Sequence, residues 1–245
     1  MIFSESILQP FNTQIQDPPV YYPTPTVVEH TPILMANQAD NVITMNRVTV
    51  IGSSGSGKST LARELGKKVG LPVIHLDKYY WHPGWVGTPL AEWRATVQQL
   101  VTADKWIIDG NYRSTLDIRL QASDTVVFLD LPRWVCVYRA MKRRIEYRNK
   151  PRPDIARGCK ESLFDPNFPR FMRWIWDYPN RARPDVLRRL NRLEDKQVIW
   201  LRSTKDVNLF LANPTGWHAT IPSFDEEFLE FLKRSRQIKS SHSTQ

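Results

Sequence analysis

The sequence predicts an α/β fold built on a parallel sheet of five strands, and three observations lead to this prediction. Short runs that are almost wholly apolar recur along the chain, and segments with helical spacing of apolar residues separate them. A loop that holds three of the chain's 10 glycines follows the first of these runs. Strands that are apolar on both faces belong to parallel sheets covered by helices on both sides, which gives a three-layer sandwich.

The individual elements follow from apolar spacing and from local start signals. The expected strands cover residues 47–51, 71–76, 106–109, 125–130 and 197–201. The expected helices cover residues 58–69, 89–102, 132–148 and about 171–178, and a last one starts at about 206. Pro89 and Pro132 stand in the first turns of two of these helices, where proline is favoured. Thr88 is expected to cap the helix that Pro89 opens.

The two ends of the chain differ from the middle. Residues 1–45 contain six prolines and no glycine, and they show no regular period, so we expect a disordered, partly polyproline-like tail. Residues 237–245 are polar and form a second expected disordered tail. One domain is therefore expected over 46–236. Within it, residues at about 149–169 are rich in proline and charge and are too long for a plain connection, which is typical of a lid.

The charge and the cysteine content of the chain limit the partners and the kinds of site that we expect. The net charge is +9, and the 60-residue stretch 133–192 holds 17 Lys and Arg against six Asp and Glu. Such a segment fits a nucleic-acid surface, the phosphates of a small ligand, or a solvated helix face. Cys136 and Cys159 lack the spacing of a metal site. With no apolar run that could span a membrane and no pattern of a signal peptide, the sequence favours a cytoplasmic protein without membrane contact.

The glycine-rich loop has the pattern G-x-x-x-x-G-K-S between a strand and a helix, which is the phosphate-binding P-loop in its required context. Backbone N–H groups and the helix dipole favour anions there. Lys58 can reach the β- and γ-phosphates, and the Ser59 hydroxyl suits Mg²⁺. The sequence therefore predicts ATP and Mg²⁺ as ligands. The expected nucleotide-binding residues are Gly52, Ser53, Ser54, Gly55, Ser56, Gly57, Lys58, Ser59 and Thr60.

From about Arg47 to Leu211 the chain resembles the adenylate-kinase-like P-loop family, and within it most of all the small bacterial DNA topology modulation proteins. The segments that carry the resemblance are GSSGSGKSTLA, LPVIHLDKYYW, WIIDGNYRSTLDIRL and LDLPRWVCVYRAMKRRIEYR. The resemblance implies a P-loop NTPase sandwich with strand order 2-3-1-4-5 and a lid insertion.

The resemblance also implies roles for single residues. It gives Asp109 a role near the ligands of Mg²⁺, for which Ser59 is the other candidate residue. It gives Arg113 a role in binding the phosphate of the acceptor. Arg139 corresponds to the arginine that stacks on adenine, and Arg143 to a catalytic arginine one helical turn later.

The acceptor side departs from the family pattern. The arginine of the family's acceptor motif is missing from residues 75–81, where aromatic side chains stand instead. Asp77 resembles the aspartate of uridine-kinase-like enzymes that accepts a hydroxyl proton. His75 lies in an apolar strand and is expected to be a packed histidine. The expected acceptor pocket joins Asp77, Asp109, Asn111 and Arg113 and has Tyr79, Tyr80 and Trp81 as walls.

The prediction for function is a phosphotransferase that uses ATP and a small acceptor such as a nucleotide, a nucleoside or another hydroxyl or phosphate compound. Lys58, Asp77, Arg113, Arg139 and Arg143 are its expected catalytic residues. Two alternatives stay open: an ATP-binding regulator that contacts DNA through residues 133–192, and a plain ATPase. If the basic segment serves a lid, its arginines at 139, 143, 170 and 173 should face the phosphates. The acceptor and the oligomeric state are left open by the sequence.

Overall fold

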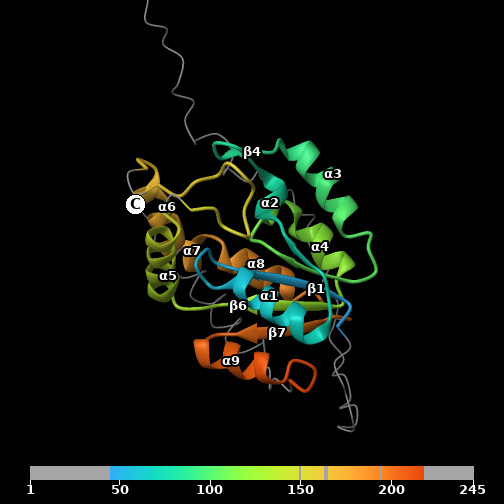
Figure 1. Ribbon diagram of the computed structural model, residues 1–245. Helices are drawn as coiled ribbons and strands as arrows, with labels where there is room; N and C mark the ends of the chain where they lie inside the picture. The colour runs from blue at the N-terminus through green and yellow to red at the C-terminus, as the bar shows by residue number, and fades with distance from the viewer. Residues whose placement is uncertain (1–44, 149, 163–164, 194, 218–245) are drawn as a thin grey trace, which may run out of the picture. The chain divides into compact units, whose positions relative to one another are not determined.

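A computed structural model describes residues 45–148, 150–162, 165–193 and 195–217, and its centre is a parallel sheet of five strands (Figure 1). The strands lie in the order β2 (Val73–His75), β5 (Trp106–Asp109), β1 (Arg47–Gly52), β6 (Thr125–Leu129) and β7 (Gln197–Leu201). Each neighbouring pair runs parallel. Numbered along the chain, these five strands have the order 2-3-1-4-5, so the predicted fold class and strand order are confirmed.

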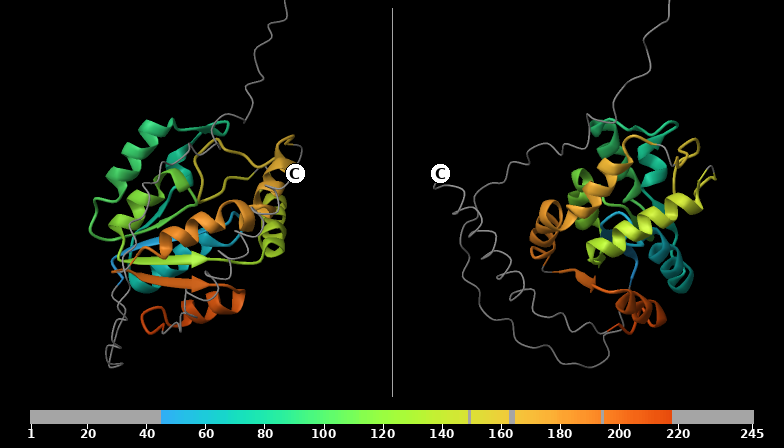
Figure 2. Two further views of the ribbon diagram at one scale, coloured as in Figure 1. Left: turned by 180° about the vertical axis from the view of Figure 1, so that it is seen from behind. Right: turned by 90° about the vertical axis from the view of Figure 1, so that its left-hand side faces the viewer.

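Helices cover both faces of this sheet, as the two views of Figure 2 show. On one face, α1 (Lys58–Val69) and α9 (Thr204–Ala212) pack on strand residues such as Val50 and Leu201. On the other face, α4 (Leu116–Ala122) and α8 (Arg183–Leu190) pack on residues such as Phe128, and α3 (Leu90–Leu100) packs on Ile108. The strands of β1, β5 and β6 are almost wholly buried because they are apolar on both faces.

A separate group of helices stands beside the carboxyl end of β6. Helix α5 (Arg133–Glu146) packs against α6 (Phe168–Trp176) through Cys136, Ala140 and Ile175. The short α7 (Tyr178–Arg181) follows α6. Between α5 and α6, residues 150–162 contain no helix and no strand, and an isolated bridge joins Glu161 to Arg148. This segment falls within the stretch whose composition predicts a lid.

Several short elements were not predicted. They are α2 (Asp77–Tyr80), the hairpin of β3 (Trp81–His82) and β4 (Val86–Gly87), the 3-10 helix η1 (Arg113–Thr115), and α4, α7 and α8. The predicted cap at Thr88 is wrong, because its hydroxyl donates instead to the carbonyl O of Tyr80 at 2.7 Å. The last helix begins at Thr204, where Ser203 and Asp206 form a reciprocal capping box. Residues 1–44 and 218–245, which include most of both expected tails, lie outside the described residues.

Candidate phosphate-binding site

The glycine-rich loop joins β1 to α1 and is wedged against two other elements. Gly52, Gly55 and Gly57 have φ values of 147°, 78° and 98°, which side-chain-bearing residues rarely adopt. A Cβ atom on Gly55 would lie 2.1 Å from the carbonyl O of Cys136 in the first turn of α5. One on Gly52 would lie 2.4 Å from the carbonyl O of Leu129 at the end of β6. Close packing therefore requires two of the three glycines, and not only the approach of a phosphate.

Lys58 opens α1 and points back over this loop. Its Nζ atom donates to the carbonyl O of Ser53 at 2.8 Å. Burial lowers the pKa of Lys58, and the negative charges of Asp109 and Asp77 act in the opposite direction. The ammonium thus lies against the glycine-rich loop and close enough to two carboxylates for their charges to act on it. Ser59 follows it at the N-terminus of α1, where N–H groups lack helical partners and favour an anion.

A buried pair of side chains joins the carboxyl ends of β2 and β5. The Nδ1 atom of His75 lies 2.6 Å from Oδ1 of Asp109, and both side chains are buried. His75 is packed, as predicted, but its ring also holds the carboxylate that the resemblance places near Mg²⁺. No cluster of three or more His, Cys, Asp or Glu that could hold a metal occurs among the described residues. Asp109 and Ser59 fit an ion that takes most of its ligands from phosphates and water, as Mg²⁺ does.

Asp77 begins α2 and lies close enough to Asp109 and Lys58 for their charges to act on it. The hydroxyl of Tyr112 donates to Oδ1 of Asp77 at 2.6 Å. Burial raises the pKa of Asp77 and the nearby Asp109 adds to this, while the hydrogen bond from Tyr112 lowers it. The Tyr112 ring is itself fixed, because its centroid lies 4.6 Å from that of Tyr80 and 4.9 Å from that of Trp93. A held carboxylate with a raised pKa is suited to accept a proton.

The loop that carries Tyr112 rests on Arg119, a residue that sequence reasoning missed. Arg119 is fully buried in α4 and donates to the carbonyl O atoms of Gly110 at 3.0 Å and Tyr112 at 2.8 Å. Burial lowers its pKa to about 10. Asn111, within this loop, has a buried Nδ2 without a hydrogen-bond partner among the described residues. Arg113 instead reaches the carbonyl O of Arg181 in α7 at 3.4 Å.

Helix α5 brings the predicted Arg139 to the glycine-rich loop and the predicted Arg143 close to Asp77. Arg139 donates through Nη1 to the carbonyl O of Ser56 at 3.2 Å and through Nη2 to the Thr204 hydroxyl at 2.9 Å. Burial lowers the pKa of Arg143, and the positive charge of Arg152 lowers it further. The positive charge of Arg143 also interacts with the negative charge of Asp77. The Nε atom of Arg143 is buried and has no hydrogen-bond partner among the residues that the structure describes.

Arg152 of the segment 150–162 was missed by sequence reasoning. It donates to Asp154 at 2.9 Å and to Glu161 at 2.7 Å. Burial raises the pKa of Asp154, but the hydrogen bond and charge of the Arg152 guanidinium lower it to about 2. The same segment contacts the hairpin, because Nε1 of Trp85 donates to the carbonyl O of Lys160 at 3.1 Å. The segment 150–162 and the β3–β4 hairpin are therefore connected by a hydrogen bond.

Contrary to expectation, Arg170 and Arg173 make no hydrogen bond or ion pair with this site among the described residues. Arg173 has a side chain that is 84% exposed and pairs with Asp177 on its own helix at 3.6 Å. Arg170 is also exposed on α6. Of the expected aromatic walls, Tyr79 is largely exposed, while Tyr80 and Trp81 contact each other at a centroid distance of 4.8 Å.

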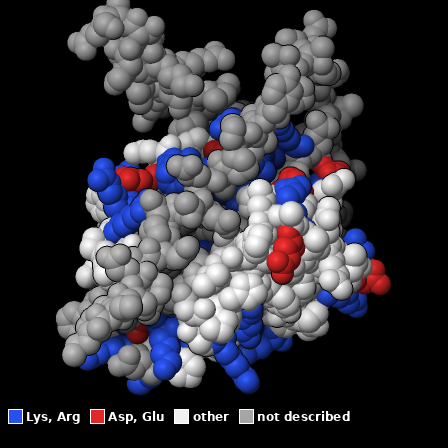
Figure 3. Space-filling model, turned by 90° about the horizontal axis from the view of Figure 1, so that it is seen from above, with Lys and Arg blue, Asp and Glu red and all other residues white. Residues whose placement is uncertain are grey.

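Many charges of the basic stretch are paired within the protein. Arg183 binds Asp130 at 2.8 Å, Arg189 binds Asp185 at 3.1 Å, and Arg144 binds Asp165 at 3.1 Å. On the face seen in Figure 3, Lys and Arg side chains lie in separate groups with acidic side chains beside them and a broad uncharged area between. Where the described residues are visible on this face, they do not form one continuous basic stripe.

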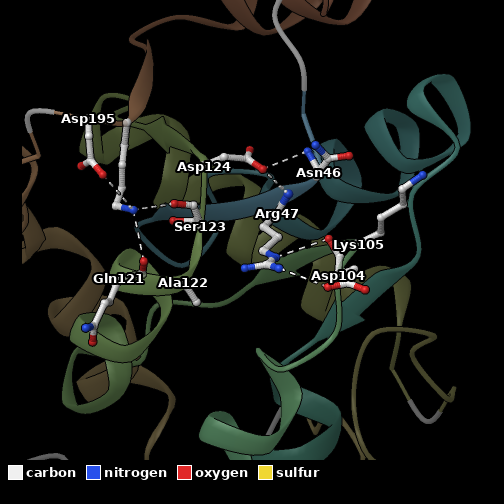
Figure 4. A pocket seen from close by; sticks show the side chains of 10 residues that line it. Asn46, Arg47, Asp104, Lys105, Gln121, Ala122, Ser123, Asp124 and Asp195 are labelled. Atoms are coloured by element: carbon white, nitrogen blue, oxygen red, sulfur yellow. Dashed lines mark hydrogen bonds and ion pairs between the residues drawn. The ribbon is translucent and has the colours of Figure 1, made fainter.

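A shallow polar pocket lies at the opposite edge of the sheet, where β1, β5 and β6 begin (Figure 4). Its groups bind one another: Asp124 accepts from the backbone N–H of Arg47 at 2.8 Å, and Lys196 donates to the carbonyl O of Ser123 at 2.9 Å. Ligands of open parallel sheets bind at the carboxyl ends of the strands. The candidate site is therefore the edge with the glycine-rich loop.

No helix among the described residues is long and apolar enough to cross a membrane.

Comparisons with known proteins give one sequence relative and several structural ones. No protein-family model matches the chain. The chain is 30% identical over 137 residues to the uncharacterized protein YqaC of Bacillus subtilis (strain 168), a match that covers 54% of this chain and 72% of that protein. A solved shikimate kinase from Bacteroides thetaiotaomicron matches with a TM-score of 0.45 at 15% identity, over 69% of this chain and 95% of the other. A gluconokinase from Sinorhizobium meliloti 1021 matches with a TM-score of 0.40 at 18% identity, over 69% and 93%.

Proposed function

The chain belongs to the same family as the uncharacterized protein YqaC of Bacillus subtilis, and from its site we propose that it is a phosphotransferase that uses ATP and Mg²⁺. The acceptor is a small molecule with a hydroxyl or phosphate group, such as a nucleotide or a nucleoside. The finer likeness to the DNA topology modulation proteins is part of this proposal and rests on the sequence motifs alone.

One observation carries the proposal: the Lys58 ammonium on the glycine-rich loop and the Asp77 carboxylate of α2 are buried close to each other. The ammonium that suits a phosphate and the carboxylate that suits a hydroxyl are near enough for each charge to influence the pKa of the other group. A plain phosphate-binding loop needs no such carboxylate. Phosphoryl transfer, in contrast, needs a positioned acceptor beside the phosphate.

The remaining residues have roles that follow from their contacts. Residues 52–60 hold the phosphates through backbone N–H groups, and Arg139 neutralises charge beside them. Ser59 and Asp109 hold Mg²⁺, which when bound neutralises phosphate oxygens. Arg143 lies beside Asp77, where it can neutralise the transferred group. Asp77 orients the acceptor hydroxyl and takes its proton as the new oxygen–phosphorus bond forms and ADP leaves. The segment 149–169 serves as a lid that excludes water.

The DNA-binding alternative is less well supported by the charge distribution. A nucleic-acid surface needs many unpaired cations on an outward face. In this protein Arg139 lies on the glycine-rich loop, and Arg144, Arg152 and Arg183 are engaged with carboxylates. The alternative of a plain ATPase differs only in the acceptor, which would be water.

A screen for ATP consumption tests the proposal. The full chain is incubated with ATP and Mg²⁺ and with sets of nucleosides, nucleotides and sugars, with and without duplex DNA. We expect ADP to form at a rate that depends on one acceptor class, and the Lys58→Ala variant to lose this activity. ADP formation at one rate regardless of the acceptor would indicate an ATPase. Tight duplex binding that falls steeply with salt and ignores ATP would favour the DNA-binding regulator instead.

A further inference from the structure

Arg119 is a buried cation that the packing of α4 does not explain. Its side chain is fully buried, like those of Leu116 and Leu120 in the same helix. A buried charge is costly, and a well-packed apolar side chain of similar volume would fill the same space at less cost. Among the described residues, the guanidinium donates to two backbone carbonyl O atoms and to no carboxylate. The presence of a cation here is therefore explained by the backbone that it holds.

The two carbonyls belong to the loop that follows β5. Nη1 of Arg119 donates to the carbonyl O of Gly110 at 3.0 Å, and Nη2 donates to that of Tyr112 at 2.8 Å. The planar guanidinium thus bridges both ends of a three-residue loop. Gly110 also packs closely on the residue before Asp77, because an added Cβ would lie 2.9 Å from Cβ of Leu76. These contacts fix the backbone from which the Tyr112 side chain extends.

Tyr112 in turn contacts the carboxylate to which we assign the acceptor's proton. Its hydroxyl donates to Oδ1 of Asp77 at 2.6 Å. The rings of Tyr80 and Trp93 restrict the tilt of the phenol from their centroid distances of 4.6 and 4.9 Å. The backbone then sets how far the hydroxyl reaches toward Asp77. Hydrogen bonds at both ends of Tyr112 therefore connect Arg119 to Asp77.

We propose that Arg119 is a positioning residue, which acts through Tyr112 to hold the Asp77 carboxylate in place for proton transfer. Without Arg119 the loop would lose its bridge, and the hydroxyl of Tyr112 would no longer be held against the carboxylate. The inference rests on the proposed function, because that function makes Asp77 the proton acceptor. The hydrogen bond itself does not depend on turnover, so it can be measured without ATP or an acceptor.

Other groups also act on Asp77 through their charges. They are Lys58 of α1, Asp109 of β5, Arg143 of α5, and Arg152 and Cys159 of the segment 150–162. A substitution of Arg119 leaves these groups in place but removes a positive charge of its own. The test must therefore separate an effect through Tyr112 from a direct effect of that charge.

A ¹³C NMR titration of the full chain, labelled at the aspartate carboxyls, measures the pKa of Asp77. Its signal is the one that is missing from the Asp77→Asn variant. Tyr112→Phe removes a hydrogen bond to the ionised carboxylate, so the pKa should rise by about one pH unit. Arg119→Met should cause a rise of similar size. In the double variant the rise should be no larger than in Tyr112→Phe, because the hydroxyl through which Arg119 acts is already absent.

Two further variants complete the test. Arg119→Lys serves if Arg119→Met does not fold, because an ammonium lacks the planar fork that bridges both carbonyls, and it should raise the pKa in the same way. Leu120→Ala is the matched control, since Leu120 is buried in the same helix and packs on the sheet. It should lower stability and leave the pKa of Asp77 unchanged.

Three results would overturn the inference. An unchanged pKa of Asp77 in the Arg119 variants would show that the bridge does not act on the carboxylate. Rises that add in the double variant would assign the effect to the charge of Arg119. An equal rise in Leu120→Ala would show that Arg119 only supports the fold. A failed acceptor screen, in contrast, would overturn the proposed function and leave this connection as measured.

Discussion

Replacing Gly55 with alanine tests how tightly the glycine-rich loop is wedged against α5. Gly55 has a φ of 78°, and an added Cβ would lie 2.1 Å from the carbonyl O of Cys136. The left-handed conformation costs an alanine about 1–2 kcal/mol. Overpacking against a backbone that cannot move freely costs about 1–3 kcal/mol more. We therefore expect Gly55→Ala to lower the free energy of unfolding by about 2–5 kcal/mol.

Gly70 provides a matched control for this substitution. It has a φ of 70°, and an added Cβ would meet nothing within 4 Å. Gly70→Ala should therefore lose only the conformational part, about 1–2 kcal/mol. Urea unfolding followed by circular dichroism measures both variants, and the difference between them isolates the clash. Equal losses would refute the close approach of the loop to α5.

Two further predictions concern the reaction. Tyr112→Phe removes a hydrogen bond that stabilises the ionised form of Asp77, so the pKa of that carboxyl should rise. The acidic limb of the pH profile of kcat/KM should then move to higher pH, and an unchanged limb would argue against Asp77 as the proton acceptor. Arg139→Ala should lower kcat/KM by about tenfold or more, because the side chain lies on the glycine-rich loop. Arg173→Ala removes an exposed arginine of the same basic stretch and should leave turnover unchanged; equal effects would contradict the assignment.

The strands of the sheet could be predicted because the apolar residues that define each strand are adjacent in the sequence. The strands β1, β5, β6 and β7 are apolar on both faces, and each run stands alone between helical patterns. The short elements carry no such pattern, since β3 and β4 have two residues each and α2 has four. Helix α4 was missed for another reason. It buries Arg119 completely, whereas charged residues are expected on the surface.

The site was predictable where a motif specifies it and not where distant residues meet. Lys58 and Ser59 follow from the spacing of the glycine-rich loop. The partner of His75 is Asp109, 34 residues away, so an apolar strand gave no indication of a polar contact. Likewise, the sequence explains Gly55 by phosphate binding, while its contact with Cys136 depends on how the chain folds back.

Calorimetric titration of ATP into the Lys58→Ala variant tests the central claim most directly. The Lys58 ammonium lies over the glycine-rich loop, where it donates a hydrogen bond to the carbonyl O of Ser53. Lys68→Ala is the control, because Lys68 is exposed near the end of the same helix. A lost contact between an ammonium and a phosphate reduces affinity by about tenfold to a hundredfold. We expect a loss of this size for Lys58→Ala with Mg²⁺ present and none for Lys68→Ala. Unchanged affinity in the Lys58→Ala variant would contradict the assignment of this loop as the nucleotide site.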